Sequence, residues 1–161
     1  MKKLLTIMLA LVMVLSLSVN AFAANITQDS TPKTADTNVT FNVDPTYTVT
    51  IPATVTLAKA ADGSYKQDAT ITAADVRLEE GKTIVVTLAC DFQLDTAASA
   101  TYKLPYTVTV DDNTTAIATD DTVATFTTNT TEQSSTLHFT AANPTYAGNY
   151  SDTVTFTIAV A

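Results

Sequence analysis

The chain has little of the residue types on which most catalytic sites depend. It contains one cysteine, one histidine, no tryptophan and three glycines in 161 residues. A single cysteine excludes an internal disulfide, and a single histidine leaves the commonest acid–base side chain at one position. The sequence has no G-x-S-x-G, H-E-x-x-H or C-x-x-C motif. We therefore expect no enzyme, and we predict no catalytic, cofactor-binding or metal-binding residues.

Basic residues are also scarce. The formal net charge of the full chain is −8, and it becomes −10 once the two lysines of the N-terminal leader are removed. Proteins bind nucleic-acid phosphates through clustered Lys and Arg side chains, whereas here the basic residues are scattered. Nucleic acid is therefore excluded as an expected partner, and the acidity indicates a solvated, self-repelling surface. The basic residues beyond the leader are Lys33, Lys59, Lys66, Arg77, Lys82 and Lys103.

The first residues have the three parts of a secretory signal peptide. Two lysines precede an apolar stretch at 4–19, and Ala-Phe-Ala at 21–23 is the A-x-A pattern that signal peptidase recognises. The apolar stretch is shorter than the roughly 20 residues that a membrane-spanning helix needs. We expect cleavage after Ala23, so that 1–23 is a signal peptide. The mature protein is expected to have no transmembrane anchor and to be secreted, extracellular or associated with the cell surface.

The mature chain divides into a polar segment and a long stretch with the period of β-strands. Residues 24–37 have one large apolar side chain, which predicts a flexible N-terminal segment. From 38 to 161 apolar and polar residues alternate in short runs separated by turn residues. We predict strands at 39–43, 47–57 with an interruption at Pro52, 69–72, 83–94, 102–110, 123–127, 136–140 and 153–160.

This rhythm predicts an all-β fold, an Ig-like antiparallel β-sandwich of about seven to eight strands over residues 38–161. Asp62-Gly63 predicts a hairpin turn, and residues 73–81 have a weak helical pattern. The closing strand at 153–160 is expected to pair within its own chain. Its apolar side chains, expected in the core, are Val154, Phe156, Ile158 and Val160.

Three single side chains have reactive groups, and we predict an ordinary structural role for each. Cys90 alternates in phase with Leu88 and Phe92, which predicts a buried, unpaired thiol. His138 lies opposite the apolar face of its strand and is predicted to be exposed without a partner. Lys103 is also predicted to point to water, which argues against an intramolecular isopeptide bond.

Two weaker binding chemistries stay open. Asp111, Asp112 and Asn113 supply oxygen ligands that suit calcium, although their spacing matches no EF-hand and turn formation is the ordinary explanation. Tyr65 and Tyr146 fall in expected loops, where aromatic rings can stack on a sugar. These residues represent the alternative functions of calcium-dependent adhesion and of glycan or host-protein binding.

The end of the chain is similar to a known group of surface proteins. The pattern Gly-x-Tyr-x-Asp-x-Val-x-Phe at 148–156 resembles the closing strand of bacterial fimbrial and spore-coat-U-like subunits. The leader and the run at 47–52 also resemble small exported surface proteins of Gram-positive bacteria. The resemblance implies a pilin- or adhesin-like sandwich. On physical grounds, Gly148 is expected to allow a tight turn. Tyr150, at the entry of the closing strand, is expected either to bond through its hydroxyl to upstream backbone, as in a tyrosine corner, or to be an ordinary core aromatic.

The combined prediction is a secreted or cell-surface structural or interaction protein. It is expected to act through surface or edge-strand contacts with a protein partner or with another copy of itself, and a glycan is the weaker alternative.

Overall fold

The structure is a computed structural model that describes residues 25–161, so the signal peptide expected at 1–23 lies outside the described residues. Residues 43–161 form one compact unit that contains all the described strands, and residues 25–42 contain none. Within 25–161 we find no helix with the length and hydropathy needed to cross a bilayer. The domain boundaries expected from the sequence stay predictions.

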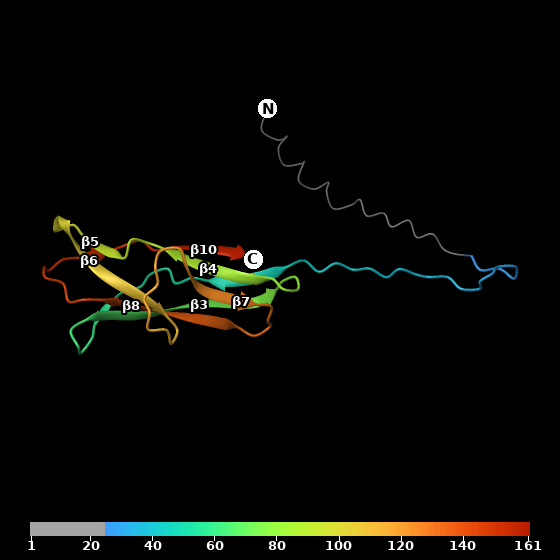
Figure 1. The fold of residues 1–161 in the computed structure, drawn as a ribbon, viewed down its shortest axis with the longest axis horizontal. Helices are drawn as coiled ribbons and strands as arrows, with labels where there is room; N and C mark the ends of the chain where they lie inside the picture. The colour runs from blue at the N-terminus through green and yellow to red at the C-terminus, as the bar shows by residue number, and fades with distance from the viewer. Residues whose placement is uncertain (1–24) are drawn as a thin grey trace, which may run out of the picture. The chain divides into compact units, whose positions relative to one another are not determined.

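In the described part of the chain, ten strands form two antiparallel sheets, whose arrangement can be followed in Figure 1. The larger sheet has the order β1-β3-β8-β6-β5-β9, with β2 also paired to β3, and the smaller sheet has the order β10-β4-β7. The strands are β1 (Thr46–Thr50), β2 (Ala58–Lys59), β3 (Tyr65–Arg77), β4 (Thr83–Ala89), β5 (Gln93–Thr96), β6 (Ser99–Val110), β7 (Asp121–Thr127), β8 (Gln133–Ala141), β9 (Tyr150–Ser151) and β10 (Thr155–Val160).

The protein is therefore an all-β, Ig-like antiparallel sandwich, and the predicted fold class is confirmed. β2 and β9 have two residues each, which leaves eight longer strands. The alternation at 39–43 and at 55–57 forms no strand in this structure, so those two predictions are wrong.

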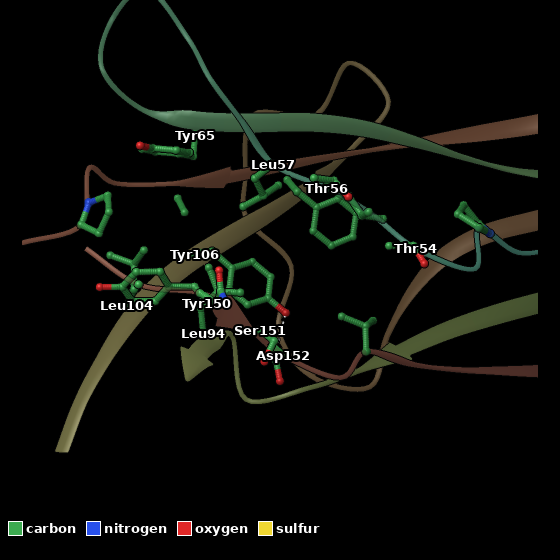
Figure 2. Close-up of a pocket in the computed structure, with 18 of the residues that line it drawn as sticks. Thr54, Thr56, Leu57, Tyr65, Leu94, Leu104, Tyr106, Tyr150, Ser151 and Asp152 are labelled. Atoms are coloured by element: carbon green, nitrogen blue, oxygen red, sulfur yellow. Dashed lines mark hydrogen bonds between the residues drawn. The ribbon is translucent and has the colours of Figure 1, made fainter. Parts of the chain in front are cut away.

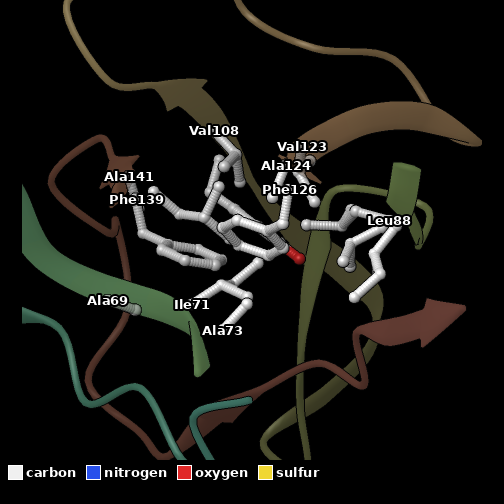
Figure 3. Close-up of a cluster of buried hydrophobic side chains, with 14 of the residues drawn as sticks. Ala69, Ile71, Ala73, Leu88, Val108, Val123, Ala124, Phe126, Phe139 and Ala141 are labelled. Carbon is white, nitrogen blue, oxygen red and sulfur yellow. The ribbon is translucent and has the colours of Figure 1, made fainter. Parts of the chain in front are cut away.

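The core lies between the two sheets. β4 contributes Ile84, Val86 and Leu88, which are all 0% exposed, as expected for a central strand with alternating inward residues. Figure 3 shows Phe126 of β7 and Leu88 facing Ile71 of the larger sheet across this core. Full burial of such a side chain stabilises the fold by about 1.5–3 kcal/mol, so this cluster is the main source of stability.

The strand expected at 83–94 is divided into β4 and β5. Phe92 has a φ of 56°, a left-handed conformation that breaks a strand, and the side chain of Asp91 accepts a hydrogen bond from the Gln93 amide at 3.0 Å. This turn takes the chain from the smaller sheet into the larger one.

The helical pattern expected at 73–81 is instead a bulged strand followed by a turn. Ala73 and Val76 are both buried although they are three residues apart, because Asp75 adopts a φ of 52° and adds one residue to β3 opposite β1. The prediction was wrong because a bulge places residues i and i+3 on one face, as a helix does. The turn that follows includes Gly81 at a φ of 80°.

The hairpin turn expected at Asp62-Gly63 is confirmed. Gly63 has a φ of 85° between β2 and β3, a conformation that favours glycine. The Asp62 carboxylate accepts hydrogen bonds from the Ser64 amide at 3.0 Å and from Lys66 Nζ at 2.7 Å. The hydrogen bond from Lys66 holds the pKa of Asp62 well below its usual range, with Ser64 adding to the effect.

Candidate functional site

The apolar side chains of β10 point toward the core side of the smaller sheet. In the register with β4, Phe156 lies opposite Leu88 and Ile158 lies opposite Val86. Directly opposed residues of an antiparallel pair share a face, and both partners on β4 are fully buried. The sequence pattern therefore identified the correct face of this strand.

This face of β10 is nevertheless left uncovered. Ile158 is 38% exposed and Val160 is 46% exposed, while Val154 and Phe156 are half-buried. The prediction that all four lie in the core is therefore wrong for Ile158 and Val160. Alternation identifies the face of a strand, but these residues stand at the edge of the sheet, where none of the strands in 25–161 buries them.

Among residues 25–161, β10 has a backbone hydrogen-bonded to a neighbouring strand on one side only. It pairs with β4 over its whole length, as expected for a strand held by its own chain. Paired backbone bonds between Ala161 and Thr83 extend the ladder by one residue, at 2.9 and 3.1 Å. Among the described strands β4 is its only partner, so the other side of β10 is free to accept one more strand.

A groove of about 880 Å³ lies beside the start of β10. Figure 2 shows Leu57 and Tyr65 on one side of this groove and Leu94 and Asp152 on the other. The groove therefore continues the uncovered apolar face of β10 toward the larger sheet. Its apolar lining includes Pro52, Val55, Leu57, Leu94, Leu104, Tyr106, Phe139, Val154 and Phe156.

One wall of the groove is a segment that stands off the larger sheet. β1 pairs with β3 up to Thr50 and Thr72, and β2 pairs again at Ala58 and Lys66. Between these two pairs, residues 51–57 run beside residues 67–71 of β3. The segment at 51–57 is two residues longer than the part of β3 beside it, so it bows away from the strand. Pro52 in this segment cannot donate to a ladder, which explains why the pairing stops here.

A buried tyrosine ties the entry of β10 to the groove. The hydroxyl of Tyr106, a residue only 6% exposed, donates to Asp152 Oδ2 at 2.6 Å. Burial raises the pKa of the Tyr106 hydroxyl far above its usual range, and the hydrogen bond to Asp152 adds to this, so the hydroxyl stays a donor. Asp152 Oδ1 accepts the Thr153 amide at 2.6 Å. Sequence analysis did not single out Tyr106 or Asp152, because neither signals a contact 46 residues away.

Of the two roles expected for Tyr150, the structure has the tyrosine corner. Tyr150 donates its hydroxyl to the backbone carbonyl of Tyr146 at 2.7 Å. Gly148 has a different role from the one expected, because its φ is not in the left-handed region. A Cβ at this position would instead lie 2.9 Å from Thr96 Oγ1, so the glycine is required by a close approach.

The two tyrosines proposed for glycan stacking line the same groove. Tyr65 is half-buried at the start of β3, whereas Tyr146 is 57% exposed. The Tyr146 ring also packs edge-on against Tyr102, with the ring centroids 5.0 Å apart.

Cys90 and His138 differ in part from their predictions. Cys90 is free but half-buried rather than buried, because β4 ends one residue before it, and its Sγ lies 3.4 Å from the Tyr106 hydroxyl. His138 has a partner, contrary to the prediction, because its Nδ1 lies 2.7 Å from Asp68 Oδ1 on the neighbouring strand. The hydrogen bond to Asp68 raises the pKa of His138.

The remaining polar candidates lie in turns or on the surface. The Asp111 carboxylate accepts the Thr136 amide at 2.7 Å and the Ser135 hydroxyl at 3.2 Å, so it bonds to the neighbouring strand β8 rather than within its own turn. Asn113 accepts the Thr115 amide at 3.0 Å, as expected for a turn residue. Among residues 25–161 no group of three or more His, Cys, Asp or Glu side chains is placed to hold a metal ion. Lys103 is exposed, as predicted, and pairs with Asp95 at 2.5 Å.

Comparison with known proteins gives likeness of fold only. No family model matches the chain, and no curated protein matches it. A chain in the CsuC–CsuE chaperone–tip adhesion subunit pre-assembly complex, from archaic chaperone-usher Csu pili of Acinetobacter baumannii, is similar with a TM-score of 0.50 and 16% identity. The match covers 72% of this chain and 40% of that one.

A second similar chain comes from a chaperone–tip adhesin complex of CFA/I fimbriae biogenesis, with a TM-score of 0.43 and 13% identity. That match covers 70% of this chain and 41% of the other, so the present chain spans about two fifths of each. At these identities the likeness is one of fold, between this sandwich and the CsuC–CsuE chain.

Proposed function

We propose that this chain is a secreted or cell-surface structural protein, rather than an enzyme, that binds a protein partner by strand addition. The partner lays an extended segment beside β10, pairs with its free backbone edge and covers its apolar face. The observation that carries the proposal is the exposure of Ile158 and Val160 on the core side of a strand whose outer edge pairs with none of the strands in residues 25–161.

Strand addition uses both features of this site. Backbone hydrogen bonds along an edge give affinity, while alternate side chains that enter an apolar groove give specificity. The groove beside β10 is already lined by apolar side chains, so an added strand buries apolar surface on both sides of the contact. The similar chains from pilus complexes support a role at the cell surface.

Hydrogen exchange of the exported protein tests this proposal. β10 and β7 are the two outer strands of the smaller sheet, so β7 is an internal control. We expect the β10 amides to be protected in material recovered from the cell surface and to exchange faster in the dilute purified monomer, with β7 unchanged. Equal exchange of β10 in the two samples would show that no strand is added there.

A further inference from the structure

Two surface turns of the protein have the same three-residue pattern in the same conformation. Residues 113–115, between β6 and β7, and residues 129–131, between β7 and β8, are both Asn-Thr-Thr. All six residues are exposed. Asn-x-Thr is the pattern to which N-linked glycans attach on the surface loops of exported proteins. Asparagine is also a common turn former, so the geometry of the two turns decides how much the turn alone explains.

The two asparagines are held in the same way. The side-chain oxygen of Asn113 accepts the Thr115 amide at 3.0 Å, and that of Asn129 accepts the Thr131 amide at 2.9 Å. The backbone amide of each asparagine donates to a carbonyl, of β6 for Asn113 and of β3 for Asn129, at 2.9 Å in both cases. Each side chain is therefore fixed through its oxygen, and no group within residues 25–161 accepts a hydrogen bond from either Nδ2.

The turns do not account for the threonines at the third position. A turn closed by an asparagine side chain uses only the backbone amide of that residue. Within residues 25–161 neither the Thr115 hydroxyl nor the Thr131 hydroxyl makes a hydrogen bond. Each pattern thus presents two groups that the fold does not use, the asparagine Nδ2 and the hydroxyl two positions later. These are the two groups that define an N-glycosylation acceptor.

We propose that Asn113 and Asn129 are acceptors for N-linked glycans. The donor is a sugar activated as a glycosyl diphosphate. Nδ2 forms a bond to the anomeric carbon of the sugar and loses one proton, while the bond from that carbon to the diphosphate oxygen breaks and the diphosphate leaves with its electron pair. No atom in the acceptor is oxidised or reduced. A glycosyltransferase is therefore the class of enzyme that must act on this chain.

The position of the two turns is compatible with the proposed strand addition. They flank β7, which is the outer strand of the smaller sheet on the side away from β10, so glycans there leave the β10 edge free. The asparagines at 25, 38 and 149 also have threonine or serine two positions later, but none of them forms the turn. Asn149 lines the groove, so a glycan on it would occupy the space that the partner strand needs.

Mass spectrometry of the full chain, recovered after export from the cells that produce it, tests the proposal. Fragmentation that leaves a sugar attached to its residue assigns each added mass to one side chain. We expect added sugar on Asn113 and Asn129. Unmodified asparagine at both positions overturns the proposal. Sugar found only on the threonine hydroxyls, or only on Asn25, Asn38 or Asn149, also overturns it.

Three variants separate the acceptor pattern from the turn. Thr115→Ala removes the hydroxyl but keeps the backbone amide that closes the turn, Thr115→Ser keeps both groups, and Thr114→Ala changes the middle position as a matched control. We expect Thr115→Ala to lose the glycan on Asn113 completely, the other two variants to keep it, and Asn129 to stay modified in all three. Circular dichroism verifies that each variant is folded. A glycan on Asn113 that survives Thr115→Ala overturns the proposal.

The size of the added mass identifies the source of the sugar. A block of several sugars with no shorter forms indicates a lipid-linked oligosaccharide as the donor, and a single sugar indicates a nucleotide sugar. Either result supports the proposal, because both donors are glycosyl diphosphates and both join Nδ2 to an anomeric carbon.

Discussion

Two isoleucines on neighbouring strands give a direct measure of how far β10 is uncovered. Ile84 on β4 is 0% exposed, and Ile158 on β10 points to the same face but is 38% exposed. Ile84→Ala is expected to lower the free energy of unfolding by about 2–5 kcal/mol, because it removes buried contacts and leaves a cavity. Ile158→Ala removes the same atoms from an open edge, where water fills the space.

The expected cost at Ile158 follows from its burial. Deleting three carbons at about 0.8 kcal/mol per buried CH₂, scaled to the roughly three fifths of the residue that is buried, gives about 1.5 kcal/mol. Urea unfolding measures both variants, at concentrations where the chain is monomeric because association adds apparent stability. An Ile158→Ala loss as large as that of Ile84→Ala would show that the β10 face is closed and would refute the open-edge argument.

Three further predictions concern single contacts. Gly148→Ala should destabilise the protein by about 1–3 kcal/mol through overpacking. This cost should be smaller in a Thr96→Ala background, which lacks the clashing hydroxyl, and a double-mutant cycle in thermal unfolding measures the difference. The raised pKa of His138 predicts a stabilising contribution that is full below about pH 6.5 and is lost as pH rises through the higher folded-state pKa; Asp68→Asn should remove this pH dependence, which NMR titration of the imidazole would follow. Tyr106→Phe should cost about 1.5–3 kcal/mol in chemical unfolding, because a hydrogen bond to a charged carboxylate is lost, and an unchanged midpoint would contradict its role at the groove.

The features that the sequence predicted correctly depend on local chemistry. The strands follow from alternation, and the Gly63 turn follows from a residue that tolerates positive φ. The hydroxyl of Tyr150 bonds to a carbonyl four residues upstream, so its partner lies within the same short motif. In each case the residues that decide the structure are neighbours in the chain.

The features that the sequence did not predict depend on residues far apart in the chain or on single backbone angles. The pair of His138 and Asp68 exists because β8 lies beside β3, a contact across 70 positions. The break after β4 depends on one positive φ at Phe92, a residue type that rarely adopts it. Gly148, in the loop before β9, must be small because a Cβ there would crowd Thr96 at the end of β5. Pattern analysis of a single sequence has no access to these partners.

The open edge of β10 was likewise not predicted from the sequence. The composition of this edge supports a role in binding a partner strand. Natural sandwiches protect exposed edges with lysine, proline or bulges, because an unprotected edge captures other strands. The β1–β2 edge of the larger sheet follows that rule, with Lys59 in β2 and Pro52 after β1. β10 has no charge and no proline, and its apolar face is uncovered at Ile158 and Val160. The contrast between the guarded β1–β2 edge and the bare β10 edge supports the proposal that β10 is kept for a partner strand.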